Sequence, residues 1–376
     1  MVPSRAMPSP HGRDPGKTRE RLLAWVTTRL PHARDIQMSK LSAPGPTGFS
    51  SDTLLFDLSW REGEDRWQQQ LVARIEPSGF RVFPHYDVGR QFRVQRQLWK
   101  SEVPVARMVW REDDPEIVGA PFYVMEQVSG RIPSDNPPYH LGGWMTEASP
   151  EEREAIWWSG LEALAAIHRL DWQERRLGIL GREDPKLSSL EGQLEDYRRY
   201  LAWASQGRPQ PTCEAALDWL VRQRPKEPEP LRLCWGDARI GNMVFRQGRC
   251  VAVLDWEMAT LGNPVQDLAW WIFMDHHHSA GCDAPRLEGM PDREATLARW
   301  AELTGLPPRH VEYYEVFAAF RFSVIMIRIA QQLVFYELLP EDSSFESDNT
   351  ATRLLASMLG LSAPGAAHPS TRANPP

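Results

Sequence analysis

The chain has 376 residues, of which 42% are hydrophobic and 25% charged, a composition typical of a globular protein with a sizeable core. This length allows two domains or one large two-lobed unit. The formal net charge of −7 argues against binding to a nucleic-acid backbone, which requires a basic surface. The four cysteines have no metal-ligand spacing and are too few for a disulfide scaffold, so we expect reduced thiols and a cytoplasmic location.

Both ends of the chain are expected to lack stable structure. Residues 1–15 are rich in proline, glycine and charge, and residues 363–376 are rich in alanine and proline. The N-terminus lacks the apolar segment of a signal peptide. The most apolar stretch, residues 316–336, contains Arg321 and Arg328, so we expect a buried helix and no membrane insertion.

Residues 16–128 are predicted to form a small α/β lobe. A helix is expected from about residue 17 to residue 30, because apolar residues recur there at helical spacing. Strands are expected at residues 36–42, 53–60, 69–75, 105–110 and 122–127, with a helix at 87–100. This order gives five strands, with one helix inserted between the third and the fourth.

Residues 129–362 are predicted to form a mainly helical lobe. The stretch from 128 to 150 contains several prolines and glycines and is expected to connect the two lobes. Helices are expected at residues 151–170, 190–204 and 213–222, and again from residue 263 onwards. Between them lies a β segment with short strands at 231–234, 243–245 and 251–254.

The segment most informative about function lies in this β segment. Residues 235–242 read WGDARIGN, and a strand of Val, Ala, Val and Leu then leads to Asp255. Two carboxylates, Asp237 and Asp255, and the amide of Asn242 are therefore expected at the ends of adjacent strands. Phosphoryl transfer uses such a set, because one carboxylate orients the attacking hydroxyl while the others hold a metal ion. The alternative interpretations are that Asp237 is only a turn residue and that Asp255 only caps the end of a strand.

This segment resembles the catalytic loop of the aminoglycoside phosphotransferase and choline kinase-like family, in which His-Gly-Asp is followed by four residues and Asn. The spacing from Asp to Asn and on to the second Asp is also that of protein kinases. The resemblance covers roughly residues 35–340 and is nearest to the branch of kinase-like domains fused to acyl-CoA dehydrogenases. That branch shares GDxRxGN, LDWE, G(D/N)P and DLAW, which occur here at 236–242, 254–257, 262–264 and 267–270.

The resemblance implies a two-lobed, protein-kinase-like α+β fold that binds ATP and Mg²⁺. Asp237 would be the catalytic base, and Asn242 and Asp255 the magnesium ligands. Glu257 would contact a second metal ion or the substrate, or would face solvent. Trp235 stands where the family has a histidine, and we expect it to pack there with its indole N–H as the polar group.

The helix after Asn263-Pro264 carries Asp267 in its first turn. In the family the matching aspartate braces the catalytic loop, here through Arg239 or through loop amides. A local role is the alternative, since the helix dipole favours an anion in the first turn.

Four residues between the first two strands, Gly45, Gly48, Ser50 and Ser51, are expected to cover the nucleotide phosphates; a plain hairpin turn is the alternative. Arg74 stands in the third strand where protein kinases place a phosphate-binding lysine, and its forked donors suit a triphosphate. An exposed strand arginine is the other interpretation.

The expected partner of Arg74 is a residue of the following helix. Gln91 occupies the position of the usual glutamate. Either this pair is weaker, or Asp87 takes its place, or the alignment is shifted. The strand at 122–127 resembles the hinge of the family, which implies adenine binding by the Glu126 carbonyl and the Val128 N–H.

The predicted function is ATP-dependent phosphorylation of a hydroxyl group on a small molecule. A hydroxyacyl or lipid-like metabolite is favoured, because the expected acceptor pocket around residues 313–336 is aromatic and apolar; an aminoglycoside-type antibiotic stays open because acidic residues follow at 337–348. A nucleotide-binding pseudokinase is the alternative. The three histidines at 276–278 are interpreted as a solvated run, with a metal site as the less favoured interpretation.

Overall fold

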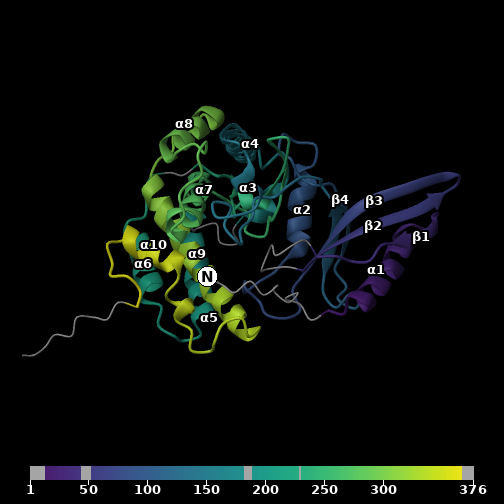
Figure 1. The fold of residues 1–376 in the computed structure, drawn as a ribbon, viewed down its shortest axis with the longest axis horizontal. Helices are drawn as coiled ribbons and strands as arrows, with labels where there is room; N and C mark the ends of the chain where they lie inside the picture. Colours follow the sequence, from purple (N-terminus) through teal and green to yellow (C-terminus); the bar gives the residue numbers. More distant parts are fainter. Residues whose placement is uncertain (1–12, 44–51, 182–188, 228–229, 366–376) are drawn as a thin grey trace, which may run out of the picture.

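The computed structural model describes residues 13–43, 52–181, 189–227 and 230–365. It has two lobes (Figure 1): a smaller lobe built on a β-sheet and a larger lobe built mainly of helices. The predicted α+β, protein-kinase-like architecture is confirmed by this arrangement and by the structural relatives described below.

The small lobe contains a five-stranded antiparallel sheet in the order β1-β2-β3-β5-β4. Its strands are β1 (Arg34–Met38), β2 (Asp52–Glu62), β3 (Asp65–Ile75), β4 (Met108–Glu112) and β5 (Phe122–Glu126). Its helices are α1 (Pro15–Arg29) and α2 (Val88–Leu98), and α2 lies between the third and fourth strands, as predicted. Asp14 and Asp87 cap the two helices, each by accepting a backbone N–H of the first turn.

The two helices cover opposite faces of the sheet. Trp25 of α1 packs with Ala73 of β3, and Phe92 of α2 packs with Val72 of the same strand. Successive side chains of a strand point to opposite faces, so Arg74 lies on the same face as Val72, the face toward α2. The sheet therefore turns Arg74 inward between the lobes.

The large lobe holds the remaining elements. Its main helices are α3 (Trp144–Glu147), α4 (Pro150–Arg169), α5 (Ser189–Ser205), α6 (Pro211–Arg222), α7 (Val265–His278), α8 (Arg293–Thr304), α9 (Val311–Phe335) and α10 (Thr350–Met358). Two antiparallel strand pairs lie among them, β6 (Arg232–Cys234) with β9 (Thr260–Gly262) and β7 (Met243–Arg246) with β8 (Arg249–Val253). Strand β9 was not predicted.

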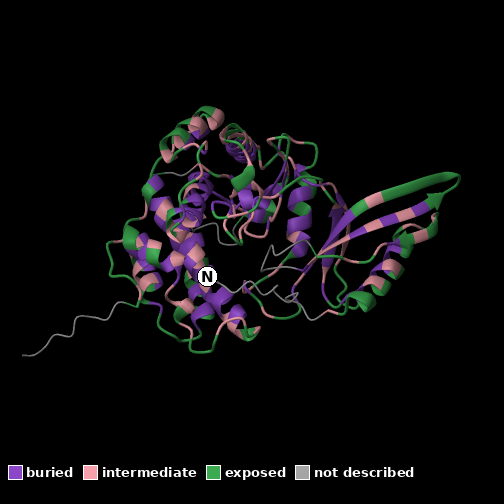
Figure 2. Ribbon diagram, viewed as in Figure 1, coloured by how far each residue is buried: buried purple, intermediate pink, exposed green. Residues whose placement is uncertain are grey.

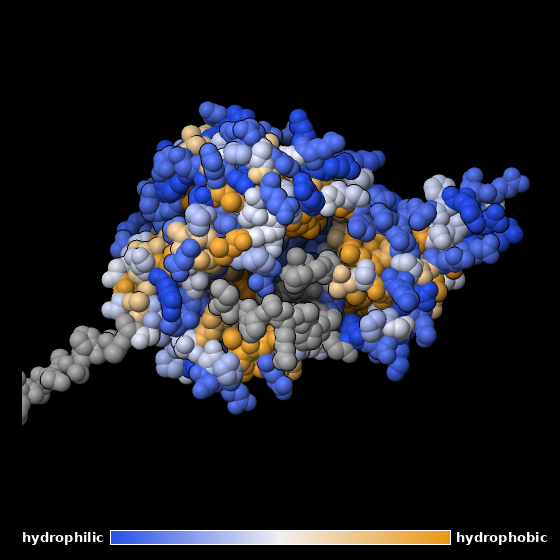
Figure 3. All heavy atoms as spheres, viewed as in Figure 1, coloured by the Kyte–Doolittle hydropathy of each residue, from blue (hydrophilic) through white to orange (hydrophobic). Residues whose placement is uncertain are grey.

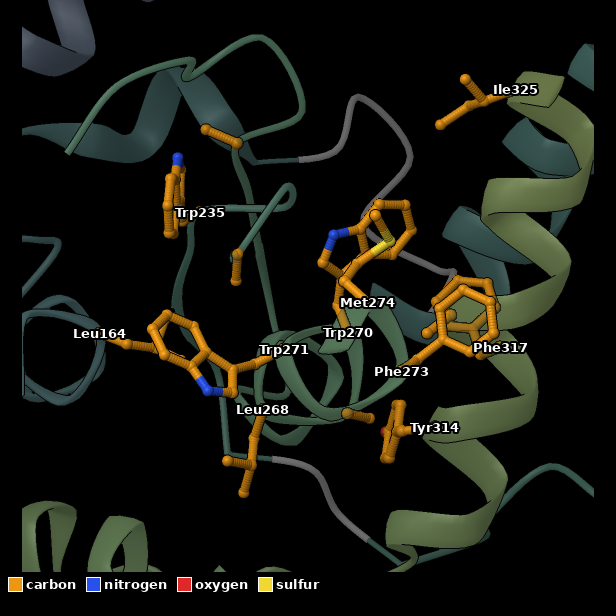
Figure 4. Close-up of a cluster of buried hydrophobic side chains, with 14 of the residues drawn as sticks. Leu164, Trp235, Leu268, Trp270, Trp271, Phe273, Met274, Tyr314, Phe317 and Ile325 are labelled. Atoms are coloured by element: carbon orange, nitrogen blue, oxygen red, sulfur yellow. The ribbon is translucent and has the colours of Figure 1, made fainter. Parts of the chain in front are cut away.

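The core of the large lobe lies around α4, α7 and α9. Trp235, Trp271 and Phe317 are buried side chains of this core (Figure 4). Helix α9 is long and apolar enough to cross a membrane, but 83% of its most apolar window is buried inside the protein (Figure 2). The prediction of a buried helix is thus confirmed. The end of the large lobe that carries α4 and α8 is mostly hydrophilic (Figure 3).

Part of the small-lobe sequence is packed into this core. Val82, Val94 and Leu98 belong to the same buried cluster as the large-lobe helices. The Tyr200 hydroxyl of α5 donates to the Val82 carbonyl at 2.7 Å, and Arg328 of α9 donates to the Arg81 carbonyl at 2.7 Å and 3.1 Å. These contacts fix how the sheet, with Arg74, faces the catalytic segment of the large lobe.

Candidate active site

The loop after β6 carries the predicted catalytic segment. Its geometry requires Gly236, which has a φ of 96° and lies so close to Met258 that an added Cβ would be 2.2 Å from the Met258 carbonyl oxygen. After Asp237 the chain forms a 3₁₀ turn at Ile240–Asn242 and enters β7. The tight turn thereby sets Asp237 and Asn242 next to each other.

Three side chains donate hydrogen bonds to the Asp237 carboxylate. Arg239 Nε donates to Oδ1 at 3.0 Å, and Trp270 Nε1 donates to the same oxygen at 2.9 Å. Asn242 Nδ2 donates to Oδ2 at 2.6 Å and to the Asp237 backbone carbonyl at 3.2 Å. Within the described ranges no residue donates to Oδ1 of Asn242, so this oxygen is available for a cation. The Asp237 carboxylate is fixed, and Oδ2 keeps room for a further donor.

Asp255 is held two residues beyond β8 in the left-handed region, with a φ of 57°. Arg74 Nη2 donates to its Oδ1 at 3.2 Å, and Arg74 Nη1 donates to Thr53 Oγ1 at 3.3 Å. Burial opposes the charge of Arg74, but Asp255, Tyr123 and Glu257 together raise the pKa of the guanidinium. The side chain of Arg74 is only 13% exposed, so the interpretation as an exposed strand arginine is wrong.

Backbone contacts hold the Asp237 loop against the Asp255 loop. The Leu254 N–H donates to the Asn242 carbonyl at 2.8 Å. Trp235 Nε1 donates to the Leu254 carbonyl at 2.8 Å and to the Asp255 carbonyl at 3.0 Å. Trp235 therefore packs in the loop and uses its indole N–H, as expected. Asn242 and Asp255 are brought to neighbouring positions at the ends of β7 and β8.

The oxygen atoms of Asn242 and Asp255 fit a magnesium ion, which prefers carboxylate and amide oxygen ligands. The described parts of the chain, this site included, contain no group of three or more His, Cys, Asp or Glu side chains able to hold a metal ion. The histidines of α7 are also not a solvated run: His278 is buried and its Nδ1 is 2.7 Å from the Met274 carbonyl, whereas His276 is exposed. The end of α7 therefore packs the His278 ring against the large lobe and leaves His276 at the surface.

Asp267 of α7 supports the catalytic loop by accepting hydrogen bonds from its backbone. It is fully buried and accepts from the Trp235 N–H at 2.6 Å and the Gly236 N–H at 3.0 Å. His168 Nε2 lies 3.2 Å from Oδ2 of Asp267, and Trp300 Nε1 donates to Nδ1 of His168 at 2.9 Å. Since an indole N–H only donates, His168 carries its proton on Nε2 and donates it to Asp267. The bracing runs through loop amides, one of the two routes expected.

Arg239 takes no part in that bracing. Its guanidinium lies between Asp237 and Asp135, forming an ion pair with each. Burial opposes its charge, but Asp135 and Asp237 together raise the pKa of Arg239. Burial alone would raise the pKa of Asp135, yet the charges of Arg239 and His278 lower it below its ordinary value. Asp135 thus balances the positive charge of Arg239, which would otherwise be paired with Asp237 alone.

The nucleotide-binding residues expected in the small lobe are only partly brought together. Gly45, Gly48, Ser50 and Ser51 lie outside the described residues. Gln91 is buried and accepts from the Tyr123 hydroxyl at 3.3 Å. Asp87 caps α2. Neither residue contacts Arg74, whose carboxylate partner is Asp255. Tyr123 lies opposite Arg74 in the sheet and bonds the Gln91 side chain instead.

The hinge segment follows β5. The Glu126 side chain pairs with Arg107 at 2.6 Å, and no described residue accepts a hydrogen bond from the Val128 N–H, which leaves this donor for a ligand. Glu257 is half-buried, and after burial its charge is the next cause of the raised pKa of Tyr86. Glu257 thus lies beside the segment of the small lobe that packs on the large one.

A model of the APH phosphotransferase enzyme family matches residues 48–304, more than half of the chain. This chain is a member of that family. Among curated relatives, mouse acyl-CoA dehydrogenase family member 11 is 28% identical over 335 residues, which cover 84% of this chain and 41% of the relative. The probable acyl-CoA dehydrogenase IBR3 of Arabidopsis thaliana is 28% identical over 83% of this chain and 39% of the relative. The chain spans about two fifths of the length of these relatives.

Two solved structures from other organisms have a fold similar to that of this chain. A putative aminoglycoside phosphotransferase from Ralstonia eutropha superposes with a TM-score of 0.65 and 26% identity, covering 90% of this chain and 95% of the other. A Plasmodium vivax ethanolamine kinase superposes with a TM-score of 0.56 and 11% identity, covering 89% and 85%, which is a likeness of fold alone.

In this member of the family, the structure adds three residues that sequence reasoning did not place in the site: Asp135, Trp270 and Arg321, whose Nη2 donates to the Gly236 carbonyl. Trp270 ends the Asp-Leu-Ala-Trp run, so its presence in a shared motif was a usable signal. Arg321 interrupts an apolar stretch, which was a weaker signal. Asp135 lies in the connection between the lobes, and nothing in its local sequence distinguishes it.

Proposed function

We propose that this protein is an active kinase that transfers the terminal phosphoryl group of ATP to a hydroxyl of a small molecule in the cytoplasm. The observation that carries the proposal is the Asp237 carboxylate, which is fixed by Arg239, Trp270 and Asn242. Its Oδ2 accepts only from Asn242 among the described residues and has room to accept from a substrate hydroxyl as well. A surface turn aspartate would need no such support.

Each residue has a role in the proposed reaction. Asp237 orients the acceptor hydroxyl and accepts its proton as the oxygen attacks the phosphorus. Asn242 and Asp255 would hold Mg²⁺, which supplies charge neutralisation to the phosphate oxygens. Arg74 lies within reach of Asp255 and would bind the same phosphates with its forked donors. Catalysis is then positioning plus electrostatic stabilisation, with no covalent enzyme intermediate.

The adenine base would lie against the hinge. The Glu126 carbonyl and the Val128 N–H would bind its edge, and the N–H is free to do so among the described contacts. The loop with Gly45, Gly48, Ser50 and Ser51 would cover the phosphates. Glu257 and Asp267 would support the site, Asp267 through the loop amides that it accepts from.

The acceptor is proposed to be a hydroxyacyl or other partly hydrophobic alcohol. Phe322 packs on Trp270, which donates to Asp237, and Tyr197 packs on Phe317 of the same aromatic cluster. A hydroxyacyl acceptor also agrees with relatives named as acyl-CoA dehydrogenases. An aminoglycoside-type acceptor is the alternative, and one structural relative was solved with ADP and hygromycin B.

A nucleotide-binding pseudokinase is the second candidate. It is favoured by one observation: Gln91 contacts Tyr123, so α2 supplies no acidic partner for Arg74, and Arg74 pairs with the metal-site residue Asp255. A protein arranged in this way could bind a nucleotide without turnover.

The two candidates are separated by measuring ADP release with a panel of hydroxyacyl thioesters, hydroxy acids, choline, sugars and aminoglycosides, with and without Mg²⁺. An active kinase gives acceptor-dependent ADP release that Asp237→Asn reduces by at least about 1,000-fold while nucleotide affinity is kept. Nucleotide binding without acceptor-dependent turnover on the whole panel would support the pseudokinase instead.

A further inference from the structure

Helix α9 places a buried arginine directly beneath the catalytic loop. Arg321 is only 3% exposed. Its Nη2 donates to the Gly236 carbonyl at 3.0 Å, and its Nε donates to the Tyr197 hydroxyl at 3.1 Å. The guanidinium also lies over the rings of Trp270 at 4.6 Å, Phe317 at 5.4 Å and Tyr197 at 5.5 Å. All of these neighbours are electrically neutral.

This cation has no counter-ion among the described residues. Within the part of the chain that the structure describes, no carboxylate lies within ion-pair distance of Arg321, and its buried Nη1 has no hydrogen-bond partner. Buried charges in proteins are normally paired, and buried donors are normally bonded. The other arginines near the site have counter-ions, since Arg74 pairs with Asp255 and Arg239 pairs with Asp135 and Asp237. Arg74 Nε is also buried without a hydrogen-bond partner among the described residues, so the missing counter-ion is what distinguishes Arg321 from these two arginines. Aromatic faces attract a cation, but they offer no acceptor for the remaining N–H groups.

Arg321 lies next to the groups that hold Asp237, the candidate catalytic base. Trp270 carries the guanidinium on its ring face and donates its N–H to Asp237, while Gly236, the residue next to Asp237, accepts from Arg321 directly. The residues expected to hold the nucleotide, Arg74 and Asp255, reach the site from the small lobe and from the loop after β8. Arg321 reaches it from α9, the helix expected to border the acceptor.

We propose that Arg321 binds an anionic group, a carboxylate or a phosphate, carried by the acceptor molecule. This inference rests on the proposed kinase activity and narrows its substrate class to hydroxylated acids. A polycationic aminoglycoside would meet an unpaired positive charge beside the hydroxyl it presents. In water-poor surroundings such as these three rings, the attraction to an anion and the repulsion of a cation are both stronger than in water.

A purely structural role for Arg321 would explain its hydrogen bond to Gly236 but not its buried, unpaired charge. Holding the Gly236 carbonyl requires one neutral N–H donor, which a glutamine could supply without burying a charge. Arg328 of the same helix is buried and also lacks a carboxylate partner among the described residues, but all of its guanidinium nitrogens are bonded: Nε and Nη2 donate to the Arg81 carbonyl and Nη1 donates to Gln331. No nitrogen of Arg328 is buried without a partner among the described residues.

The test compares medium-chain hydroxy acids with their primary amides, which share a carbon skeleton and differ in charge. Binding to the full-length protein is measured by calorimetry with Mg²⁺ and a non-hydrolysable ATP analogue, and turnover is measured by ADP release. We expect the wild-type protein to favour the acids by about 10- to 100-fold, the range for a hydrogen bond to a charged partner. Arg321→Gln should abolish this preference and keep the weaker binding of the amides. Arg328→Gln, the matched loss of a buried arginine from the same helix, should retain it.

Three results would overturn the proposal. One is that no hydroxy acid binds the wild-type protein more tightly than its amide. Another is that Arg321→Gln weakens acids and amides by the same factor, which would make Arg321 only a support for Gly236. The third is that the substitution weakens the ATP analogue instead, which would assign Arg321 to the nucleotide. Because binding is measured without turnover, a failure of the kinase proposal appears separately, as hydroxy-acid binding without ADP release.

Discussion

Trp270 donates its indole N–H to Oδ1 of Asp237 at 2.9 Å, whereas Trp271 beside it has a buried indole nitrogen with no partner among the described residues. Both residues belong to α7, and both are almost completely buried. Helix α7 therefore places one donor at the candidate base and turns the adjacent indole into the core. This pair permits the removal of a bonded and an unbonded indole N–H from adjacent buried positions of one helix.

Trp270→Phe should lower kcat by about 10- to 100-fold, because a hydrogen bond to a charged group contributes about 1.5–3 kcal/mol. The KM for ATP should change little, since Asp237 does not hold the nucleotide in the proposed mechanism. Trp271→Phe is the control and should leave kcat within about twofold. Equal losses in the two variants would show that Trp270 acts only through packing.

Arg74→Met should weaken ATP binding by about 100-fold, since it removes charge-assisted hydrogen bonds to the phosphates. Gln91→Ala should instead leave ATP affinity nearly unchanged, because Gln91 accepts from Tyr123 and does not contact Arg74. Calorimetric titration with the ATP analogue checks both variants. A large loss of affinity in Gln91→Ala would mean that Gln91 turns toward Arg74 when a nucleotide binds.

Asp267→Ala should destabilise the protein by about 3 kcal/mol or more, because each buried donor left without its acceptor costs about 1–3 kcal/mol. The Trp235 and Gly236 N–H groups and His168 would all lose their acceptor. Denaturant unfolding measures the change. Asp292→Ala, which removes only the cap of α8, serves as comparison and should cost about 1 kcal/mol. An Asp267 variant no less stable than the Asp292 variant would contradict the bracing role.

The folded protein should lose stability as the pH falls below about 6.5, the ordinary pKa of histidine. Burial, followed by the charges of His278 and Arg239, holds the pKa of His277 well below that value. The unfolded chain therefore binds a proton in this range that the folded chain does not, so the free energy of unfolding decreases with decreasing pH.

The check is denaturant unfolding between pH 7.5 and about pH 5. His277→Phe should flatten the pH dependence, and its ring can keep the edge-on contact with Phe322. His276→Phe, at an exposed position, should leave the slope as in the wild-type protein. A slope unchanged by His277→Phe would assign the pH dependence to other groups.

The sequence was sufficient for much of the fold and for the centre of the site. Alternating and helical apolar patterns predicted the five strands and α2, because these patterns are set by local burial. Asp237 and Asn242 lie five residues apart in one tight loop, so their proximity follows from local geometry. Asp255 could be added because a short buried strand leads directly to it.

What could not be predicted depends on packing between distant segments. The Trp270–Asp237 and Arg321–Gly236 hydrogen bonds join α7 and α9 to the loop after β6, and no local pattern records such pairings. The sequence left the partner of Arg74 open between Gln91 and Asp87, because the contact that Tyr123 of β5 makes with Gln91 cannot be read from the local sequence. Strand β9 was missed because three residues, one of them Gly262, are too few to show a period.

The burial of Val82, Val94 and Leu98 among the large-lobe helices has a consequence for how this protein can be divided. A polypeptide ending after the sheet would carry these side chains without their covering helices, and the remainder would have a matching gap in its interior. The two lobes should therefore melt in a single cooperative transition. Residues 13–365 should therefore be transferred into another polypeptide as a whole, with both lobes present.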